Sequence, residues 1–459
     1  MKNTTPVVCI LLAALFLALI GQFGFVNADE PSAQKQDSVQ KPFDFDEATR
    51  NVPKPKETWP LVKKDMVPMD LKILSDEIVT SDTDPSKKLR KITATFNSMK
   101  LDGKIWSHPC VIFTPADNSI NLKPERLGKV AIVSSPCAPG NMVFDAHVAK
   151  YGEPTATKTN YPVMVLANPG VYPDGSHVER DIRVLGKIGR ETGKYYYNMN
   201  CQLAVVYIQA MNAMEKILGL ETVKAVLCGH SKRGLSTPVA AAMDSRVASA
   251  VIMGNEGVCP RDRVTPWLSF HYPFFQDQVH VPVFYLGATN EDGYTMFNVN
   301  LSQSLCKKPM TIEMIPNYRH NNFSEKQYMD FMMWVSHTFD NRPLSHISDV
   351  THEKKDRLHI YRAKIDTKAK IQVVTLWYAY TDNPEWRDVM WYGLPMQKKE
   401  DGRWQGATFG KTPDAYMIEV GDISHGVAGY VSSLPQKLTP ITPKKRPGRG
   451  MPKLWQPTD

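Results

Sequence analysis

Short, almost uninterrupted apolar runs alternate with helix-length segments through the middle of the chain, and this alternation most limits its possible folds. Apolar runs of about four to eight residues are typical of strands buried on both faces of a parallel sheet. The clearest helical pattern covers residues 197–218, where apolar side chains recur on one face. The alternation predicts an α/β fold: a mostly parallel central sheet flanked by helices, with the functional site at the carboxyl ends of the strands. The apolar runs cover residues 110–113, 129–134, 162–167, 225–228, 248–253 and 281–286.

After about residue 345 the pattern changes to strands separated by turn signals such as Asp401-Gly402, with no helical pattern between them. This change predicts an α/β domain over residues 59–345 and a small antiparallel β-sandwich over residues 346–435. The sandwich is expected either as an appended domain or as an edge packed on the α/β core. The strand-like segments cover residues 358–366, 371–380, 389–395, 415–420 and 427–432.

The two ends of the chain differ from its globular middle. Residues 1–28 combine Lys2, an apolar stretch and small residues before Asp29, which predicts a cleaved export signal and a secreted or periplasmic protein. An uncleaved membrane anchor is the alternative, and no other integral membrane segment is expected. Residues 29–58 are polar and predict a flexible arm, while the basic, Pro-rich residues 436–459 predict a disordered tail.

The formal net charge of +8 raises the question of a nucleic-acid or membrane partner. Part of the excess comes from Lys444, Lys445, Arg446 and Arg449 in the tail, so a solvated tail is the simpler interpretation. Weak binding to anionic surfaces remains as the alternative. We therefore predict no nucleic-acid partner.

The cysteines carry no metal-binding pattern. Of the seven, Cys9 lies in the leader, and the remaining even number permits disulfides in an oxidising compartment. A mixture of buried thiols and one or two bridges is expected. The chain contains neither Cys-x-x-Cys nor His-Glu-x-x-His, so no metal site and no cofactor are predicted.

The most informative stretch is residues 225–234, Ala-Val-Leu-Cys-Gly-His-Ser-Lys-Arg-Gly, followed by a helix of small residues. An apolar strand that leads through Gly229 to Ser231 and then into a helix predicts the nucleophile elbow of an α/β-hydrolase fold. The tight turn leaves little room for side chains around the serine. The usual second glycine is replaced by Arg233, and Gly234 comes one position late. A buried or helix-capping serine is the alternative.

A serine hydroxyl needs a neighbouring base to become a nucleophile, and the base needs an acid to orient it. His320 follows the apolar run 311–315 and precedes a helix expected from near Ser324, which is where the base of this fold belongs. His230 adjoins the elbow but should point away from Ser231. The other histidines considered, His108, His271 and His425, are less well placed.

The acid is predicted in the loop after the strand at residues 281–286. Glu291 is the first choice, and its neighbour Asp292 is the second. Glu256, after the strand that follows the elbow, is the third because some hydrolases of this fold take their acid from that position. A solvated loop carboxylate is the alternative for each of them.

The oxyanion formed on attack needs preorganised hydrogen-bond donors. The backbone N–H of Lys232 is one candidate by its position, and a second is expected at Ser135, after the strand at residues 129–134. The side chains of Lys232 and Arg233 add positive charge beside the oxyanion, hold an anionic substrate, or form ion pairs on the elbow helix. The sequence leaves these three possibilities open.

At the elbow and at four further motifs, the chain resembles the PhoPQ-activated pathogenicity-related protein family of the α/β-hydrolase superfamily. The similarity runs over roughly residues 90–435 and implies that Glu291 and Glu256 occupy acidic positions of that family. The elbow is also similar to that of glucuronoyl esterases, Gly-x-Ser-Arg-x-Gly, which implies a carbohydrate-ester substrate. The shared motifs are Gly-x-Ser-Lys-Arg-Gly at 229–234, Trp-Ser-His at 106–108, Ala-Met-Asn-Ala at 210–213, Asp-Ser-Arg-Val at 244–247 and Ile-Pro-Asn at 315–317.

Together these features predict an exported serine hydrolase in which Ser231 attacks an ester, His320 moves the proton and Glu291 orients His320. The expected partner is a small-molecule or carbohydrate ester. A peptidase or amidase with the same triad is one alternative. A non-catalytic envelope protein that binds through its β-sandwich is another. The sequence is silent on the particular ester and on the oligomeric state.

Overall fold

The computed structural model describes residue 44 and residues 53–101, 103–116, 124–172, 174–178, 198–254, 271–291, 296–320, 324–382 and 386–439. These described residues all belong to one compact unit. The predicted export signal at 1–28, most of the predicted arm and the tail beyond residue 439 lie outside the described residues.

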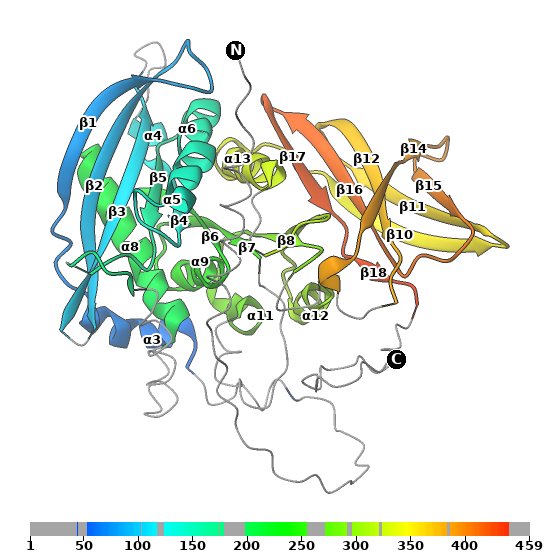
Figure 1. Ribbon diagram of the computed structural model, residues 1–459, viewed down its shortest axis with the longest axis horizontal. Helices are drawn as coiled ribbons and strands as arrows, with labels where there is room; N and C mark the ends of the chain where they lie inside the picture. Colours follow the sequence, from blue (N-terminus) through cyan, green and yellow to red (C-terminus); the bar gives the residue numbers. More distant parts are fainter. Residues whose placement is uncertain are drawn as a thin grey trace, which may run out of the picture. The chain divides into compact units, whose positions relative to one another are not determined.

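A nine-stranded sheet forms the centre of the fold, in the order β1-β2-β3-β5-β4-β6-β7-β8-β9 (Figure 1). The strands from β5 to β9 are parallel to one another, and β1, β2 and β3 extend the sheet in antiparallel fashion. The mostly parallel sheet of an α/β-hydrolase-like fold is therefore confirmed. The strands are β1 (Lys72–Thr80), β2 (Lys88–Leu101), β3 (Lys104–Pro115), β4 (Lys129–Ser135), β5 (Val163–Ala167), β6 (Lys224–His230), β7 (Val247–Met253), β8 (Val283–Ala288) and β9 (Thr311–Ile315).

Helices cover both faces of this sheet because its central strands are apolar on both faces. Along β6, Ala225 and Leu227 belong to one buried cluster, whereas Val226 and Cys228 belong to the other. The predicted helix at 197–218 is α8, and it is buried on almost all sides rather than along one stripe. The helices are α3 (Pro55–Val62), α4 (Pro124–Leu127), α5 (Met142–His147), α6 (Glu153–Thr159), α8 (Met199–Leu218), α9 (Lys232–Met243), α11 (Tyr272–Phe275), α12 (Asn298–Leu305) and α13 (Glu325–Asp340), with shorter turns η1 (Lys63–Asp65), η2 (Val148–Gly152), η5 (Gln276–Gln278) and η6 (Trp386–Asp388).

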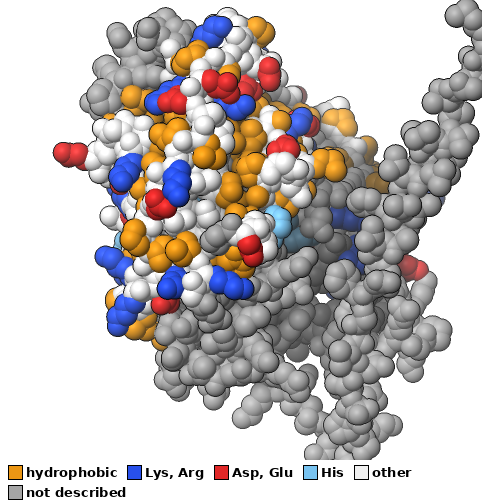
Figure 2. All heavy atoms as spheres, turned by 60° about the vertical axis from the view of Figure 1, so that its left-hand side comes forward, with side chains coloured by type: hydrophobic (Ala, Val, Ile, Leu, Met, Phe, Trp, Pro, Cys, Tyr) orange, Lys and Arg blue, Asp and Glu red, His pale blue; other side chains and the backbone are white. Residues whose placement is uncertain are grey.

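The edge strand β1 carries exposed apolar side chains, including Leu74 and Ile78. Figure 2 turns this side of the molecule towards the reader and shows apolar side chains interspersed with charged ones. Arg90 of β2 pairs with Asp76 of β1 at 2.6 Å, across the two strands. Charged side chains of this kind protect an edge strand from pairing with other chains.

The C-terminal part consists of antiparallel sheets, as predicted. One sheet has the order β10-β11-β15-β14 and the other β13-β12-β16-β17, with β18 paired to β16. The two sheets meet through Tyr361 and Tyr416, whose ring centroids are 4.8 Å apart. Their strands are β10 (His346–Lys355), β11 (Leu358–Asp366), β12 (Lys370–Ala379), β13 (Trp391–Pro395), β14 (Gln397–Lys398), β15 (Trp404–Phe409), β16 (Ala415–Ser424), β17 (Val427–Ser432) and β18 (Gln436–Lys437).

These sheets pack on the α/β core at its β9 edge. The Ser432 hydroxyl of β17 accepts a hydrogen bond from the Met314 N–H of β9 at 2.9 Å, and Asp330 of α13 accepts one from the Tyr430 N–H at 2.6 Å. Arg342, which is fully buried, pairs with Asp422 of β16. Of the two arrangements considered for the sandwich, packing on the core is the one observed.

Two predicted boundaries were wrong. The arm was expected to extend to residue 58, but α3 begins at Pro55, where proline suits the first helical turn, and Thr58 and Val62 are buried. The disordered tail was expected from residue 436, but Gln436 and Lys437 pair with β16. Tertiary contacts therefore order residues whose local sequence is polar.

Cys110, Cys201 and Cys228 are buried thiols, and the expected thiols are confirmed at these positions. Burial raises the pKa of Cys110 and of Cys201 to about 12, and that of Cys228 well above its usual value. Only three of the six cysteines after the leader then remain, so two bridges among these cysteines, the upper end of the expectation, are excluded. None of the helices in the described ranges is both long enough and apolar enough to span a bilayer.

Candidate active site

Ser231 lies in the turn between β6 and α9, as predicted, with φ 59° and ψ −131°. This backbone conformation is rare for a residue with a side chain, and such strain is concentrated at functional sites. The Ser231 N–H donates to the Met253 carbonyl of β7 at 2.8 Å, which fixes the turn to the end of the neighbouring strand. The Ser231 side chain makes no capping hydrogen bond to α9, so the alternative of a helix-capping serine is contradicted.

Two glycines permit this turn, although they are not in the usual spacing. A Cβ atom at Gly229 would lie 2.4 Å from the Tyr207 hydroxyl and 2.7 Å from the Ser134 hydroxyl. A Cβ atom at Gly234 would lie 2.6 Å from the Gly229 carbonyl, because α9 packs closely on β6 at this point. Gly234 therefore allows the close helix–strand contact although it comes one position late.

Glu291 and His320 are in contact, although they come from different loops. Glu291 follows β8 and is 8% exposed, and its Oε1 forms an ion-pair contact with Nδ1 of His320 in the loop after β9. Because Nδ1 faces the carboxylate, Nε2 is the nitrogen left to exchange a proton with another group. The two residues predicted from the sequence as acid and base, Glu291 and His320, are thus in contact in the structure. Their catalytic roles stay a prediction.

His230 was expected to point away from Ser231, and the structure places it beside the proposed base. Its ring lies against that of His320, with a centroid distance of 4.5 Å and an interplanar angle of 51°. His230 is the last residue of β6, paired with Met253 of β7. Burial, together with the charges of His320 and Arg233, holds the pKa of His230 well below its usual value, so it stays neutral beside His320.

Gly254 marks the point where these side chains meet. It follows β7 with φ +54°, and a Cβ atom there would lie 3.1 Å from His230 Nε2 and 3.5 Å from both Glu291 Oε2 and His320 Nδ1. Met253, whose carbonyl accepts the Ser231 N–H, is its chain neighbour. The backbone of Ser231 is thus bonded to the strand end beside which the Glu291–His320 pair lies.

The predicted oxyanion donors lie on adjacent elements. Lys232 is the first residue of α9, where backbone N–H groups and the helix dipole favour negative charge. Ser135 ends β4, which pairs with β6 so that Val133 lies opposite Cys228. Two residues further along, this register places Ser135 level with His230, one strand away from the elbow. Their role as oxyanion donors stays a prediction.

The side chain of Arg233 is buried, with 6% exposure, rather than spread over the surface of α9. Its charge contributes to the low pKa of His230 and, together with the larger effect of burial, to that of His147 on α5, which is about 4. Arg233 therefore adds positive charge next to the histidines of the site.

Asp292 and Glu256, the alternative acids, lie outside the described residues. His108 is a core histidine, with Nδ1 at 2.9 Å from the Ala167 carbonyl and Nε2 at 2.6 Å from the Ser98 hydroxyl. His271 is half-buried, and its removal from water lowers its pKa to about 4. Within the described ranges, no group of three or more histidine, cysteine or acidic side chains is arranged to hold a metal ion.

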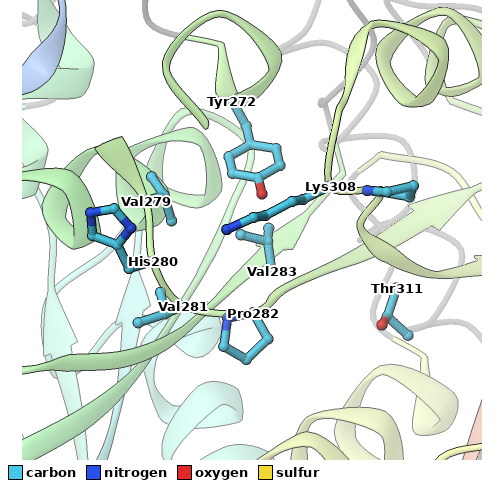
Figure 3. A pocket seen from close by; sticks show the side chains of 9 residues that line it. Tyr272, Val279, His280, Val281, Pro282, Val283, Lys308 and Thr311 are labelled. Carbon is cyan, nitrogen blue, oxygen red and sulfur yellow. The ribbon is translucent and has the colours of Figure 1, made fainter. Parts of the chain in front are cut away.

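A cavity of about 210 Å³ lies elsewhere, at the amino ends of β8 and β9 (Figure 3). Val283 and Thr311, the first residues of these strands, line it together with Tyr272 and Lys308. Glu291 and His320 follow the carboxyl ends of the same strands. The cavity therefore lies at the opposite edge of the sheet from the candidate site.

Sequence reasoning missed two asparagines that hold the site loops. The Asn290 side chain lies within hydrogen-bonding distance of three carbonyls in residues 386–389, and Asn317 exchanges hydrogen bonds with the backbone of Trp391. The only local signal was at Asn317, because asparagine adopts positive φ values such as its 59° more readily than most residues.

No family model and no curated protein matches the chain. Solved structures similar to it include acetyl xylan esterase 1 from Thermoanaerobacterium sp., with TM-score 0.41 and 12% identity over 64% of this chain and 94% of that one. A cold-adapted esterase from an Arctic intertidal metagenomic library has TM-score 0.38 and 16% identity over 58% and 96% of the two chains. Glucuronoyl esterase from Solibacter usitatus has TM-score 0.36 and 11% identity over 62% and 94%.

All these similarities are distant. The α/β-hydrolase-like fold is defined instead by the order of the mostly parallel sheet and by the strand, turn and helix around Ser231.

Proposed function

We propose that this protein is an exported serine hydrolase that cleaves carboxylic esters through Ser231, His320 and Glu291. The observation that carries the proposal is the contact between Glu291 and His320 beside the end of β7, to which the strained Ser231 turn is bonded. The order Ser, acid, His along the chain is that of the α/β-hydrolase triad.

In the proposed reaction, the Ser231 hydroxyl attacks the ester carbonyl while His320 Nε2 takes its proton. Glu291 stabilises the imidazolium through Nδ1. The backbone N–H of Lys232 and a donor near Ser135 stabilise the oxyanion. The C–O bond of the ester then breaks, and the alcohol leaves with the proton held by His320. Water, deprotonated by His320, then attacks the acyl carbonyl. The bond to the Ser231 oxygen breaks, the acid is released and His320 returns the proton to Ser231.

The substrate class we propose is a carbohydrate ester. Its support is the Gly-x-Ser-Lys-Arg-Gly elbow at residues 229–234, which resembles that of glucuronoyl esterases and of the PhoPQ-activated pathogenicity-related family. The positive charge of buried Arg233 near the site is compatible with an acidic sugar.

The direct test is covalent labelling of the folded protein with a fluorophosphonate. The wild type should be labelled and Ser231→Ala should not, because only an activated serine hydroxyl reacts with this probe. Methyl-glucuronate and acetylated sugars, p-nitrophenyl esters and peptide anilides then separate an esterase from a peptidase. Absence of labelling in the folded wild type would favour the non-catalytic alternative and would sink this proposal.

The acid can be identified by comparing three matched variants, Glu291→Gln, Asp292→Asn and Glu256→Gln. If Glu291 orients His320, its variant should lose turnover by about 10³-fold or more, with little change in substrate binding. The other two variants should keep most of their activity. A larger loss in either of them would move the acid to that residue.

Export is part of the proposal, and its basis is the signal-like segment at residues 1–28. In a bacterial host, the mature protein should be recovered outside the cytoplasm with Asp29 as its first residue. Mass spectrometry of the N-terminal peptide checks this. Recovery of the intact N-terminus in the membrane fraction would support the anchor instead.

A further inference from the structure

The C-terminal sheets contact both loops that carry the proposed acid and base. Asn290 directly precedes Glu291 and is 6% exposed. Its Nδ2 lies 3.2, 2.9 and 2.7 Å from the carbonyl oxygens of Trp386, Arg387 and Val389, in the connection between β12 and β13. One amide thus holds the turn that leads into β13.

Asn317 makes the second contact, three residues before His320. Its Nδ2 donates to the Trp391 carbonyl at 2.9 Å, and its Oδ1 accepts from the Trp391 N–H at 2.8 Å. This reciprocal pair resembles the one that two residues exchange in an antiparallel sheet. Arg319 also pairs with Asp388, but both side chains are largely exposed, so this ion pair contributes little.

The two loops are also bonded to each other. The Asn290 N–H donates to the Tyr318 carbonyl at 2.9 Å, and the Asn317 N–H donates to the Thr289 hydroxyl at 2.9 Å. The Thr289 hydroxyl in turn donates to Asn290 Oδ1 at 2.7 Å. The acid loop, the base loop and residues 386–391 therefore form one hydrogen-bonded unit.

Residues 386–391, which we name the docking segment, are held in place by apolar burial. Trp386, Val389 and Trp391 are 4%, 7% and 2% exposed and belong to the core cluster on one face of the central sheet. The Trp386 ring also packs edge-on against Phe297, at 5.2 Å between centroids. Because the segment is fixed to the core, it can fix the loops that bond to it.

We propose that the docking segment positions His320 against Glu291 through Asn317 and Asn290, which makes the C-terminal sheets part of the active site's supporting structure. This inference rests on the proposed function. Neither asparagine touches the reacting atoms, so both are positioning residues. A displacement of about 1 Å in a catalytic group can cost about 10²-fold in rate.

The test compares Asn317→Gly and Asn290→Ala with the matched control Asn300→Ala. Glycine at residue 317 removes the amide but tolerates the positive φ, so backbone strain is not added. The Asn300 side chain of α12 also donates to the backbone of the C-terminal part, to the Pro435 carbonyl at 2.8 Å, but this partner lies outside the docking segment. The control therefore loses a similar hydrogen bond without touching the site.

Turnover of an ester that the wild type cleaves and the rate of fluorophosphonate labelling are measured per folded protein, with folding followed by circular dichroism. Both loop variants should lose about 10- to 100-fold in kcat and in labelling rate, with KM changed by less than about 3-fold. They should still be labelled completely at long times, because Ser231 remains. Asn300→Ala should keep wild-type kcat while losing similar stability.

Wild-type kcat in both loop variants, or an equal loss of kcat in Asn300→Ala, overturns the positioning role. If one of the two loop variants does not fold, the other variant alone tests the positioning role, because each variant breaks contacts to a different part of the docking segment. A wild type that is never labelled disproves the proposed function instead, so the two failures are distinguishable.

Discussion

The turn at Ser231 depends on the absence of two side chains, at Gly229 and Gly234. Both positions meet atoms of neighbouring elements closer than a Cβ contact allows. At Gly229 the nearest of these are the Tyr207 and Ser134 hydroxyls, which bond to each other at 2.6 Å and cannot both retreat without breaking that bond. The conformation of Ser231 therefore depends on the close packing around these two glycines.

We therefore expect Gly229→Ala to destabilise the protein by about 1–3 kcal/mol or more, as overpacking does in other cores. Urea unfolding followed by circular dichroism measures the effect. Gly140→Ala is the matched control: its φ is +83° and nothing lies within 4 Å of the added Cβ, so it should show only the cost of the backbone conformation, about 1 kcal/mol. Equal losses in the two variants would show that crowding at the elbow is unimportant.

The residues of the candidate site differ in how far the sequence could predict them. Ser231 was predictable because strand, turn and helix are consecutive, so the signal is local. Glu291 and His320 were predictable from the strands that precede them, since carboxyl ends of parallel strands meet at one edge. The contact between His230 and His320 was not predictable, because it joins residues 90 positions apart and only the fold brings them together.

At the scale of the elements, the burial of a strand determined whether it could be predicted from the sequence. The strands from β4 to β9 are buried on both faces and read as continuous apolar runs. In β2, by contrast, only alternate residues such as Ile92, Ala94 and Phe96 are buried, and β1 is almost wholly exposed. These two strands therefore showed no continuous run and were not predicted, although they complete the central sheet.

The docking segment shows a second limit. Asn290 and Asn317 are polar loop residues whose partners lie about 70 to 100 positions further along the chain. No periodicity or turn signal encodes such a contact, so only the fold reveals it. The C-terminal strands themselves were largely predictable, but their relation to the site loops was not.

Across the whole molecule, buried charges join the central sheet to the C-terminal sheets. Glu313 of β9 and Asp330 of α13 are fully buried, and Glu419 of β16 pairs with Lys326 of α13. The charges of Glu419, Asp330 and Lys326 all act on Glu313. The Trp377 indole N–H donates to the other Glu419 oxygen at 3.1 Å. Three buried carboxyl groups thus interact with one lysine whose side chain is 25% exposed, so their ionisation is linked to the packing of the two parts.

Burial raises the pKa of Glu313 well above its usual value, and the charges of Glu419 and Asp330 add to this effect, while Lys326 opposes it. The pKa of Glu313 is therefore higher in the folded protein than in the unfolded chain. The contribution of protonated Glu313 to the free energy of unfolding is complete below the unfolded pKa of about 4.3, and it is lost as pH rises through the folded pKa. Glu313→Gln removes this titration with little change in volume. Its stability relative to the wild type should therefore increase with pH above about 5, by up to about 1.4 kcal/mol per pH unit until the folded pKa is passed.

Urea unfolding of the wild type and of Glu313→Gln, at about pH 5, 6, 7 and 8, measures the difference in their free energies of unfolding across this range. The matched control is Glu325→Gln on the same side of the fold, where the carboxylate is 74% exposed and pairs with Lys150 at the surface. That substitution should change stability by less than about 1 kcal/mol, with no trend in pH. A constant difference between the wild type and Glu313→Gln over this range would mean that Glu313 stays ionised inside the protein. In that case Lys326 would compensate the buried charge fully, and the two parts of the molecule would remain joined independently of pH.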